Sequence, residues 1–197
     1  MAYVLGFFAA DGNMIKTNRG TYFLAFHSAD KQILLLIKKT MGSDHKLSRR
    51  SVRSGGVYRF QIGSKEMFKD LSLFGFKQTK TGRLTLPKVP KKYIGDFVRG
   101  YFDGDGNVWS GFINKNRTKK TSVIYASFTS GSVNFLDNLL QILKKEGIRG
   151  GSIYKIKNKQ CGRLSFSTID SLKLYEIMYN MPHRLYLERK KLVFEKY

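Results

Sequence analysis

The 197 residues of the chain are enough for one domain or for two small halves fused into one. Lys and Arg number 36 against 14 Asp and Glu, and the resulting net charge of +22 favours a polyanionic partner. The sequence has no apolar run of about 18 residues, no basic leader and no cysteine besides Cys161, so we expect an intracellular protein (cytoplasm, nucleoid or organelle matrix) with no membrane partner and no disulfide framework.

Helices and pairs of strands alternate along the chain. The first half is predicted to contain, in order, a helix at 2–11, strands at 13–18 and 21–28, a helix at 31–41, strands at 45–53 and 57–63, and a helix at 65–74. Residues 77–92 follow as a linker, in which Pro87 and Pro90 exclude a long helix. The second half is predicted to contain a helix at 91–105, strands at 107–113 and 122–129, a helix at 133–146, strands at 150–158 and 161–168, a helix at 170–179, and a charged helix at 185–195.

The two halves have the same order of elements because the sequence repeats itself. The matched segments, first copy and then second, are VLGFFAADGN at 4–13 and VRGYFDGDGN at 98–107, FHSAD at 26–30 and FTSGS at 128–132, and RFQIGS at 59–64 and RLSFST at 163–168. A polar insert, NKNRTKKT at 114–121, predicts a longer hairpin loop in the second copy. We therefore expect an α+β fold of two repeats, residues 1–76 and 93–197, each with a four-stranded sheet.

Small residues line one side of both motif helices. Gly6 and Ala10 are four residues apart on the first helix, and Gly100 and Gly104 are four apart on the second. Each Gly inside a helix costs about 1 kcal/mol relative to Ala, so these residues need a structural reason. Close packing of the two helices through these stripes would supply that reason.

Each small-residue stripe is followed by an acid, Asp11 or Asp105, at a helix C-terminus where the dipole disfavours negative charge. Brought together, the two carboxylates would repel each other unless a divalent cation neutralised them, an arrangement suited to metal-assisted phosphodiester hydrolysis. One Asp-Gly alone would indicate an ordinary turn, but two at equivalent repeat positions favour a shared site. A calcium-binding EF-hand is excluded, because Val108 stands where its loop needs Gly and Asn114 where it needs Glu.

The two motifs, VLGFFAADG and VRGYFDGDG, resemble those of the LAGLIDADG homing endonucleases of the single-chain, two-motif kind, and the resemblance extends over essentially the whole chain. It implies two αββαββα repeats related by a pseudo-two-fold axis, with antiparallel sheets that form a DNA-binding saddle. It also implies a monomer that makes a staggered double-strand break in a long DNA target. The first motif has Ala9 where the second has Asp103, an earlier acid that the family does not use for metal.

The resemblance implies a set of catalytic residues. The last acids of the motifs, Asp11 and Asp105, would hold Mg²⁺ together with backbone carbonyls near Ala10 and Gly104. Mn²⁺ would substitute, and Ca²⁺ would support binding without cleavage. Lys80, before LTLP, and Lys190, in LERK, match the family's lysine positions and would stabilise phosphate charge or orient the attacking water.

The strands carry alternating residues suited to DNA. In VYRFQIG, Arg59 and Gln61 are expected to point outward and to contact base edges, as is Arg163 in GRLSF. In the strand at 152–158, Lys155 and Lys157 are expected to share the outward face, with Tyr154 and Ile156 inward. The further expected DNA contacts, mainly to phosphate, are Lys16, Asn18, Arg19, Lys46, Arg49, Arg50, Arg53, Asn114, Lys115, Arg117, Lys119, Lys120 and Lys159.

Two other functions remain open. An intron-splicing maturase, which would bind RNA on the same fold, fits the basic sheet surface equally well. A catalytically silent DNA-binding regulator is disfavoured by the presence of both Asp11 and Asp105. The outward residues of the two halves differ, which predicts an asymmetric target of about 15 to 20 base pairs.

Overall fold

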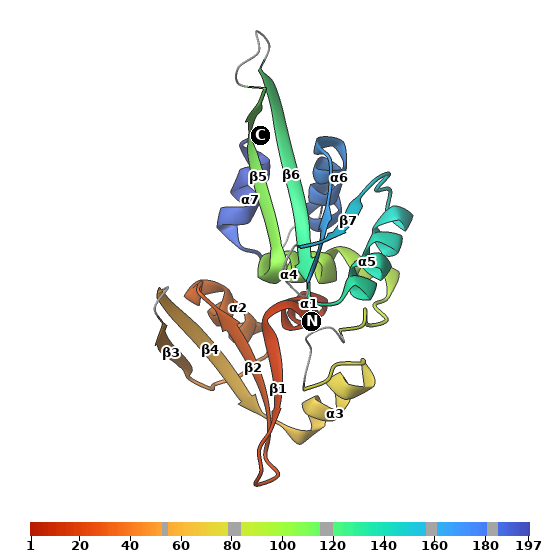
Figure 1. The fold of residues 1–197 in the computed structure, drawn as a ribbon. Coiled ribbons are helices and arrows are strands. Elements are labelled where there is room, and N and C mark those ends of the chain that lie inside the picture. The colour runs from red at the N-terminus through yellow and green to blue at the C-terminus, as the bar shows by residue number, and fades with distance from the viewer. Residues whose placement is uncertain (53–54, 79–83, 115–119, 157–160, 181–184) are drawn as a thin grey trace.

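The computed structural model describes residues 1–52, 55–78, 84–114, 120–156, 161–180 and 185–197 (Figure 1). The first half comprises α1 (Ala2–Asp11), β1 (Gly12–Lys16), β2 (Tyr22–Ser28), α2 (Lys31–Thr40), β3 (Leu47–Val52), β4 (Gly55–Gly63) and α3 (Lys65–Leu73). The second comprises a 3₁₀ turn (Lys91–Tyr93), α4 (Ile94–Asp105), β5 (Gly106–Ile113), β6 (Thr121–Ser130), α5 (Val133–Lys145), β7 (Ser152–Lys155), β8 (Gly162–Ser165), α6 (Thr168–Tyr179) and α7 (Glu188–Glu195). In the described part of the chain, no helix combines the length and apolar character that a membrane crossing requires.

The strands form two four-stranded antiparallel sheets of the same topology. Their orders are β1-β2-β4-β3 and β5-β6-β8-β7. In Figure 1, α1 and α4 lie side by side at the centre of the molecule, and the two sheets extend away from this helix pair in different directions. The predicted α+β fold of two equivalent repeats is confirmed.

The helices α1 and α4 pack with their backbones in contact, as the small-residue stripes predict. A Cβ on Gly6 would overlap the carbonyl oxygen of Phe97, and a Cβ on Gly100 would overlap that of Tyr3. These two overlaps are equivalent in the repeats, because Tyr3 and Phe97 occupy matching positions. At the end of the stripe, a Cβ on Gly104 would overlap the Cβ of Ala10. Gly6, Ala10, Gly100 and Gly104 therefore all lie at the contact between α1 and α4, and both helices belong to one core that spans the two halves.

Gly12 and Gly106 follow the motif acids, and neither forms a turn. Each is the first residue of a strand and has an extended backbone, with φ of −83° and −87°. Glycine is required there for space, since a Cβ would overlap the side chain and carbonyl of Phe8 or Phe102 one turn earlier. The chain thus passes from each motif helix directly into a strand, so that each acid lies where a helix meets a sheet.

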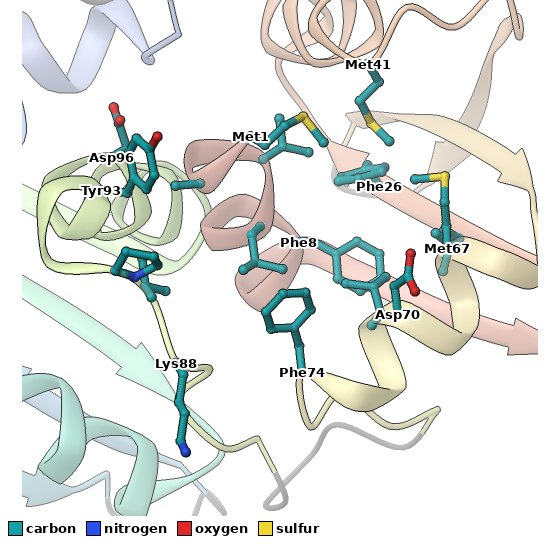
Figure 2. A pocket seen from close by; sticks show the side chains of 17 residues that line it. Met1, Phe8, Phe26, Met41, Met67, Asp70, Phe74, Lys88, Tyr93 and Asp96 are labelled. Carbon is teal, nitrogen blue, oxygen red and sulfur yellow. The ribbon is translucent and has the colours of Figure 1, made fainter.

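An apolar cavity of about 660 Å³ lies between α1, β2, α3 and the segment that leads into the first turn of α4, which contributes Lys88, Tyr93 and Asp96 (Figure 2). Phe8, Phe26, Met67 and Phe74 surround it, and neither motif acid lines it. The cavity accompanies the loose packing of α3, which has no fully buried residue, whereas its counterpart α6 buries four. The cavity belongs to the packing of α3 and the linker rather than to the region of the motif acids.

Candidate functional site

The C-terminal ends of α1 and α4 bring Asp11 and Asp105 into one neighbourhood. A Cβ on Gly104, the residue before Asp105, would lie 3.2 Å from Oδ2 of Asp11. Both acids are close enough to the buried Tyr101 hydroxyl to change its pKa. Burial raises this pKa most, and the negative charges of Asp105 and Asp11 raise it further. Two acids separated by 94 positions in the sequence therefore act on the same buried group, as their equivalent repeat positions predict.

Beside Asp11 the surface is hollowed to a volume of about 800 Å³. Its wall combines residues from both halves: His27 at the end of β2, Asp103 and Gly104 in α4, and Arg189 in α7. Sequence reasoning assigned no role to His27 or Arg189. His27 is matched in the second repeat by Thr129, so the repeat itself gave no signal, and Arg189 reaches the hollow only through the packing of α7.

Asp103 is buried, and its side chain forms hydrogen bonds with residues of both halves. Its Oδ2 accepts hydrogen bonds from the Tyr3 hydroxyl of α1 at 2.7 Å and from the Leu187 backbone N–H at 2.9 Å. Burial raises the pKa of this carboxyl, and the two hydrogen bonds partly counter that effect. Through Oδ2, Asp103 therefore connects α1 to the segment before α7.

Lys190 is buried rather than solvated, with 6% of its surface exposed. Its Nζ donates hydrogen bonds to the carbonyl oxygens of Phe102 at 2.6 Å, Asp103 at 2.8 Å and Gly106 at 2.6 Å. Burial lowers the pKa of the ammonium to about 8, although the nearby carboxylates act in the opposite direction. The three bonds hold the carbonyls on both sides of Gly104 and Asp105, so Lys190 fixes the junction between α4 and β5.

Replacing Lys190 by Met is expected to lower stability and, in the endonuclease that the sequence resemblance implies, the cleavage rate as well. Three carbonyl oxygens lose their partner, which should reduce the free energy of unfolding by about 2–4 kcal/mol. Displacement of the junction that carries Asp105 should slow cleavage by about 10² to 10³, the range for one lost electrostatic group. Urea unfolding and single-turnover cleavage measure the two effects. An unchanged unfolding free energy would contradict the role at the junction, and an unchanged rate would contradict the role in catalysis.

The groups at this junction that could hold a metal ion are oxygen donors, of the kind that Mg²⁺ prefers. The described residues contain no group of three or more His, Cys, Asp and Glu side chains that could hold a metal ion. A structural zinc site needs four such ligands. Mg²⁺ keeps several waters and binds through one or two carboxylates together with substrate phosphate. The expected ligands, Asp11 and Asp105 with the carbonyls near Ala10 and Gly104, would supply donors of this kind.

The outward face of each sheet carries the side chains expected to meet bases. Arg59 and Gln61 alternate with Phe60 and Ile62, which are buried against the helices. In the second sheet, Arg163 is paired with Thr129 on the face opposite the buried residue Leu164. The predicted orientations in β4 and β8 are therefore confirmed, and Arg59 and Arg163 occupy equivalent places in the two repeats.

Three basic residues that are expected to contact DNA lie on the helix-facing side of their sheets rather than on the outward side. Lys155 has the parity of Ile153, which packs against the core, so the outward residue of β7 is Tyr154 and the predicted orientation of this strand is wrong. The cationic groups of Arg49 and Lys16 lie 5.6 Å and 5.4 Å from the ring centroids of Tyr58 and Tyr22 on the helix-facing side. The predicted orientation of β7 is wrong because it rests on hydropathy alone. The prediction assigns Tyr154 to the core, but a tyrosine can lie on either face of a strand.

The remaining expected DNA contacts fall into two groups. In the described part, Arg50 lies on the outward face of β3, Asn18 and Arg19 lie in the turn after β1, Lys46 precedes β3, and Asn114 and Lys120 flank the long hairpin loop. Outside the described residues are Arg53, Lys80, Lys115, Arg117, Lys119, Lys157 and Lys159.

Comparison with known proteins agrees with this architecture. Residues 92–180 match the family model of a LAGLIDADG-like domain. An uncharacterized protein of Methanocaldococcus jannaschii is 27% identical over 99% of this chain and 71% of its own length. Two solved structures have a similar fold. The structure of I-SmaMI bound to cleaved DNA has a TM-score of 0.66 and 13% identity, and the match covers 100% of this chain and 88% of that one. The structure of a mesophilic variant of I-DmoI has a TM-score of 0.63 and 13% identity, and the match covers 92% of this chain and 96% of that one. Residues 92–180 are thus similar to a LAGLIDADG-like domain, and the whole chain has the fold of the solved LAGLIDADG homing endonucleases.

Proposed function

We propose that the chain is a divalent-metal-dependent endonuclease that makes a staggered double-strand break in a long, asymmetric DNA site. The observation that carries this proposal is the meeting of Asp11 and Asp105 at the point where both sheets begin. The structures of I-SmaMI bound to an uncleaved DNA target in the presence of calcium ions, and of I-DmoI in complex with DNA and Mn, support a DNA partner and a divalent cation. Because one chain supplies both acids and both sheets, a monomer suffices.

The roles of the side chains follow from their positions. Asp11 and Asp105 would hold Mg²⁺, which when bound lowers the pKa of water and neutralises phosphate charge. Lys190 keeps the Asp105 junction in place through its three carbonyl bonds. Arg59 and Arg163, on the outward faces close to the helix pair, would contact the DNA on opposite sides of the cleaved bonds. The two acids would thus serve the cleaved phosphates through the cation, whereas the two arginines would serve the neighbouring base edges.

The test is selection followed by cleavage. A randomised duplex library is bound to the protein in Ca²⁺, the bound duplexes are amplified, and these are incubated with the protein in Mg²⁺ or Mn²⁺. Both strands are expected to be cut at one position. Selected duplexes that stay intact in both metals would indicate a DNA-binding regulator instead. Preferential retention of structured RNA over the selected duplexes would indicate the maturase.

Arg59→Ala and Lys120→Ala are expected to affect binding in different ways. Arg59 lies on the base-facing side of β4, so its loss should relax preference at one or two base pairs. Lys120, exposed beside the hairpin loop, should contact phosphate, so its loss should weaken all sequences alike and reduce the log–log salt slope by about 0.9. Lys155→Ala, on the helix-facing side, is the control. Affinities at several salt concentrations, on selected and scrambled duplexes, distinguish these outcomes; a uniform loss for Arg59→Ala would contradict its base contact.

A further inference from the structure

Two aromatic side chains lie exposed on the outward face of the second sheet, where no described helix covers them. Trp109 of β5 and Tyr125 of β6 are directly paired across the strands and are 47% and 40% exposed. Their rings are nearly parallel, with 13° between the planes and 6.2 Å between the centroids. The indole also lies over Gly111, since a Cβ there would come within 2.6 Å of Cζ2 of Trp109. The pair is therefore an ordered apolar surface.

The residues next to the Trp109–Tyr125 pair are small or apolar. Val123 is paired with Gly111 on the same outward face and is only 6% exposed, although it does not belong to the core cluster of the molecule. Gly111 leaves the space that the indole occupies. A small apolar cluster thus stands on the face that should meet the polyanion, where solvated polar side chains would be the default.

The first sheet has a smaller pair at the equivalent place. Ile15 of β1 and Phe23 of β2 are paired in the same register and are partly buried. Ile15 corresponds to Trp109 by the repeat of the motif helices, and Phe23 corresponds to Tyr125 by the repeat of the second strands. Two apolar pairs are therefore related by the pseudo-two-fold axis between α1 and α4.

The distance of each apolar pair from the motif acids indicates which base pair of a bound DNA duplex it would contact. Trp109 lies four residues beyond Asp105, and Ile15 lies four residues beyond Asp11. Four strand residues span about 13 Å, which corresponds to about four base pairs of B-form DNA. The two pairs would therefore lie at similar distances on either side of the cleaved bonds. In Figure 1, β5 and β6 run outward from the end of α4, which is the direction this spacing requires.

The only apolar group that a base pair presents in the major groove is the C5 methyl of thymine. We infer that the Trp109–Tyr125 pair, and to a lesser extent the Ile15–Phe23 pair, selects thymine through this methyl about four base pairs outward from each cleaved phosphate. The inference rests on the proposed function. A duplex is favoured over single-stranded RNA as the partner because two symmetry-related pairs match the local two-fold symmetry of duplex DNA. The larger, more exposed pair makes the second half-site the more dependent on thymine.

The experiment removes single methyl groups. Duplexes selected in Ca²⁺ are resynthesised with deoxyuridine in place of one thymidine at a time, which deletes the methyl and keeps base pairing. Affinity of the wild-type protein is expected to fall about fourfold at the sensitive position in one half-site, the value for one buried carbon group, and less in the other. The Trp109→Ala/Tyr125→Ala double variant should bind more weakly. It should lose this sensitivity only in the half-site that the second sheet contacts.

Phe112→Ala is the matched control, because Phe112 is an exposed aromatic on the same strand but on its other face, opposite Ser122. It should keep the full sensitivity to deoxyuridine, as should Lys155→Ala. Equal affinity of the wild-type protein for every thymidine and deoxyuridine duplex would overturn the inference while leaving the proposed endonuclease intact. Sensitivity that survives in the double variant would also overturn it. A protein that selects no duplex, or that prefers single-stranded RNA, would overturn both proposals.

Discussion

Cleavage of both strands is expected to fall by at least about 10³-fold when Asp105 or Asp11 is replaced by Asn. The substitution keeps the shape of the side chain but removes the negative charge that would hold the cation, and a metal's charge stabilisation contributes several kcal/mol to such a reaction. Specific binding in Ca²⁺ should change much less, because affinity comes from the outward faces of the sheets. The measurement is single-turnover cleavage of a selected duplex labelled on both strands, with binding measured in parallel.

The helix α4 offers a matched control for this experiment. Asp103 lies two residues before Asp105, but its Oδ2 is occupied by the Tyr3 hydroxyl and the Leu187 N–H. Asp103→Asn should therefore retain cleavage within about tenfold of the wild type, apart from any loss of folded protein. Wild-type rates in Asp11→Asn or Asp105→Asn would refute the metal assignment. A loss in Asp103→Asn as large as in Asp105→Asn, with the protein still folded, would show that the wrong acid was assigned.

Gly100→Ala is expected to lower the free energy of unfolding by about 3 kcal/mol or more. Inside a helix this change would normally add about 1 kcal/mol of stability, so a loss must come from the helix contact. The added Cβ would overlap the carbonyl oxygen of Tyr3 and crowd the backbone N of Phe7, and backbone atoms cannot move aside by a change of rotamer. The two motif helices would have to separate, which would also disturb the spacing of their acids.

Urea unfolding compares Gly100→Ala with Gly6→Ala and with Gly63→Ala. The first two should behave alike, because their overlaps are equivalent in the two repeats. Gly63, on an exposed part of β4, has Phe23 at 3.4 Å from an added Cβ, so Ala there makes ordinary contact and should change stability by less than about 1 kcal/mol. Gly100→Ala with wild-type stability would mean that the helices adapt, and that the small-residue stripe is not needed for their packing.

The order of elements could be predicted from sequence because it depends on local signals. The side chains of Asp30 and Ser132 accept hydrogen bonds from the first N–H groups of α2 and α5, and Gly42 and Gly147 have positive φ just beyond the C-termini of these helices. Arg59 and Gln61 could be oriented because they alternate with large apolar residues in a long strand. The strand β7 could not, since Tyr154 and Lys155 fit either face until the pairing with β8 is known.

The two repeats, the pairing of their motif helices and the neighbouring positions of Asp11 and Asp105 could be predicted from the sequence, because each of these leaves a repeated pattern along the chain. The partners of Lys190, the two hydrogen bonds of Asp103 and the outward position of Trp109 became visible only in the folded structure. Lys190 reaches carbonyls 84 to 88 positions away, and Asp103 meets a hydroxyl 100 positions away. Such contacts depend on how separate elements pack, and a hydrogen bond to a backbone carbonyl leaves no trace in the identity of the residue that supplies it.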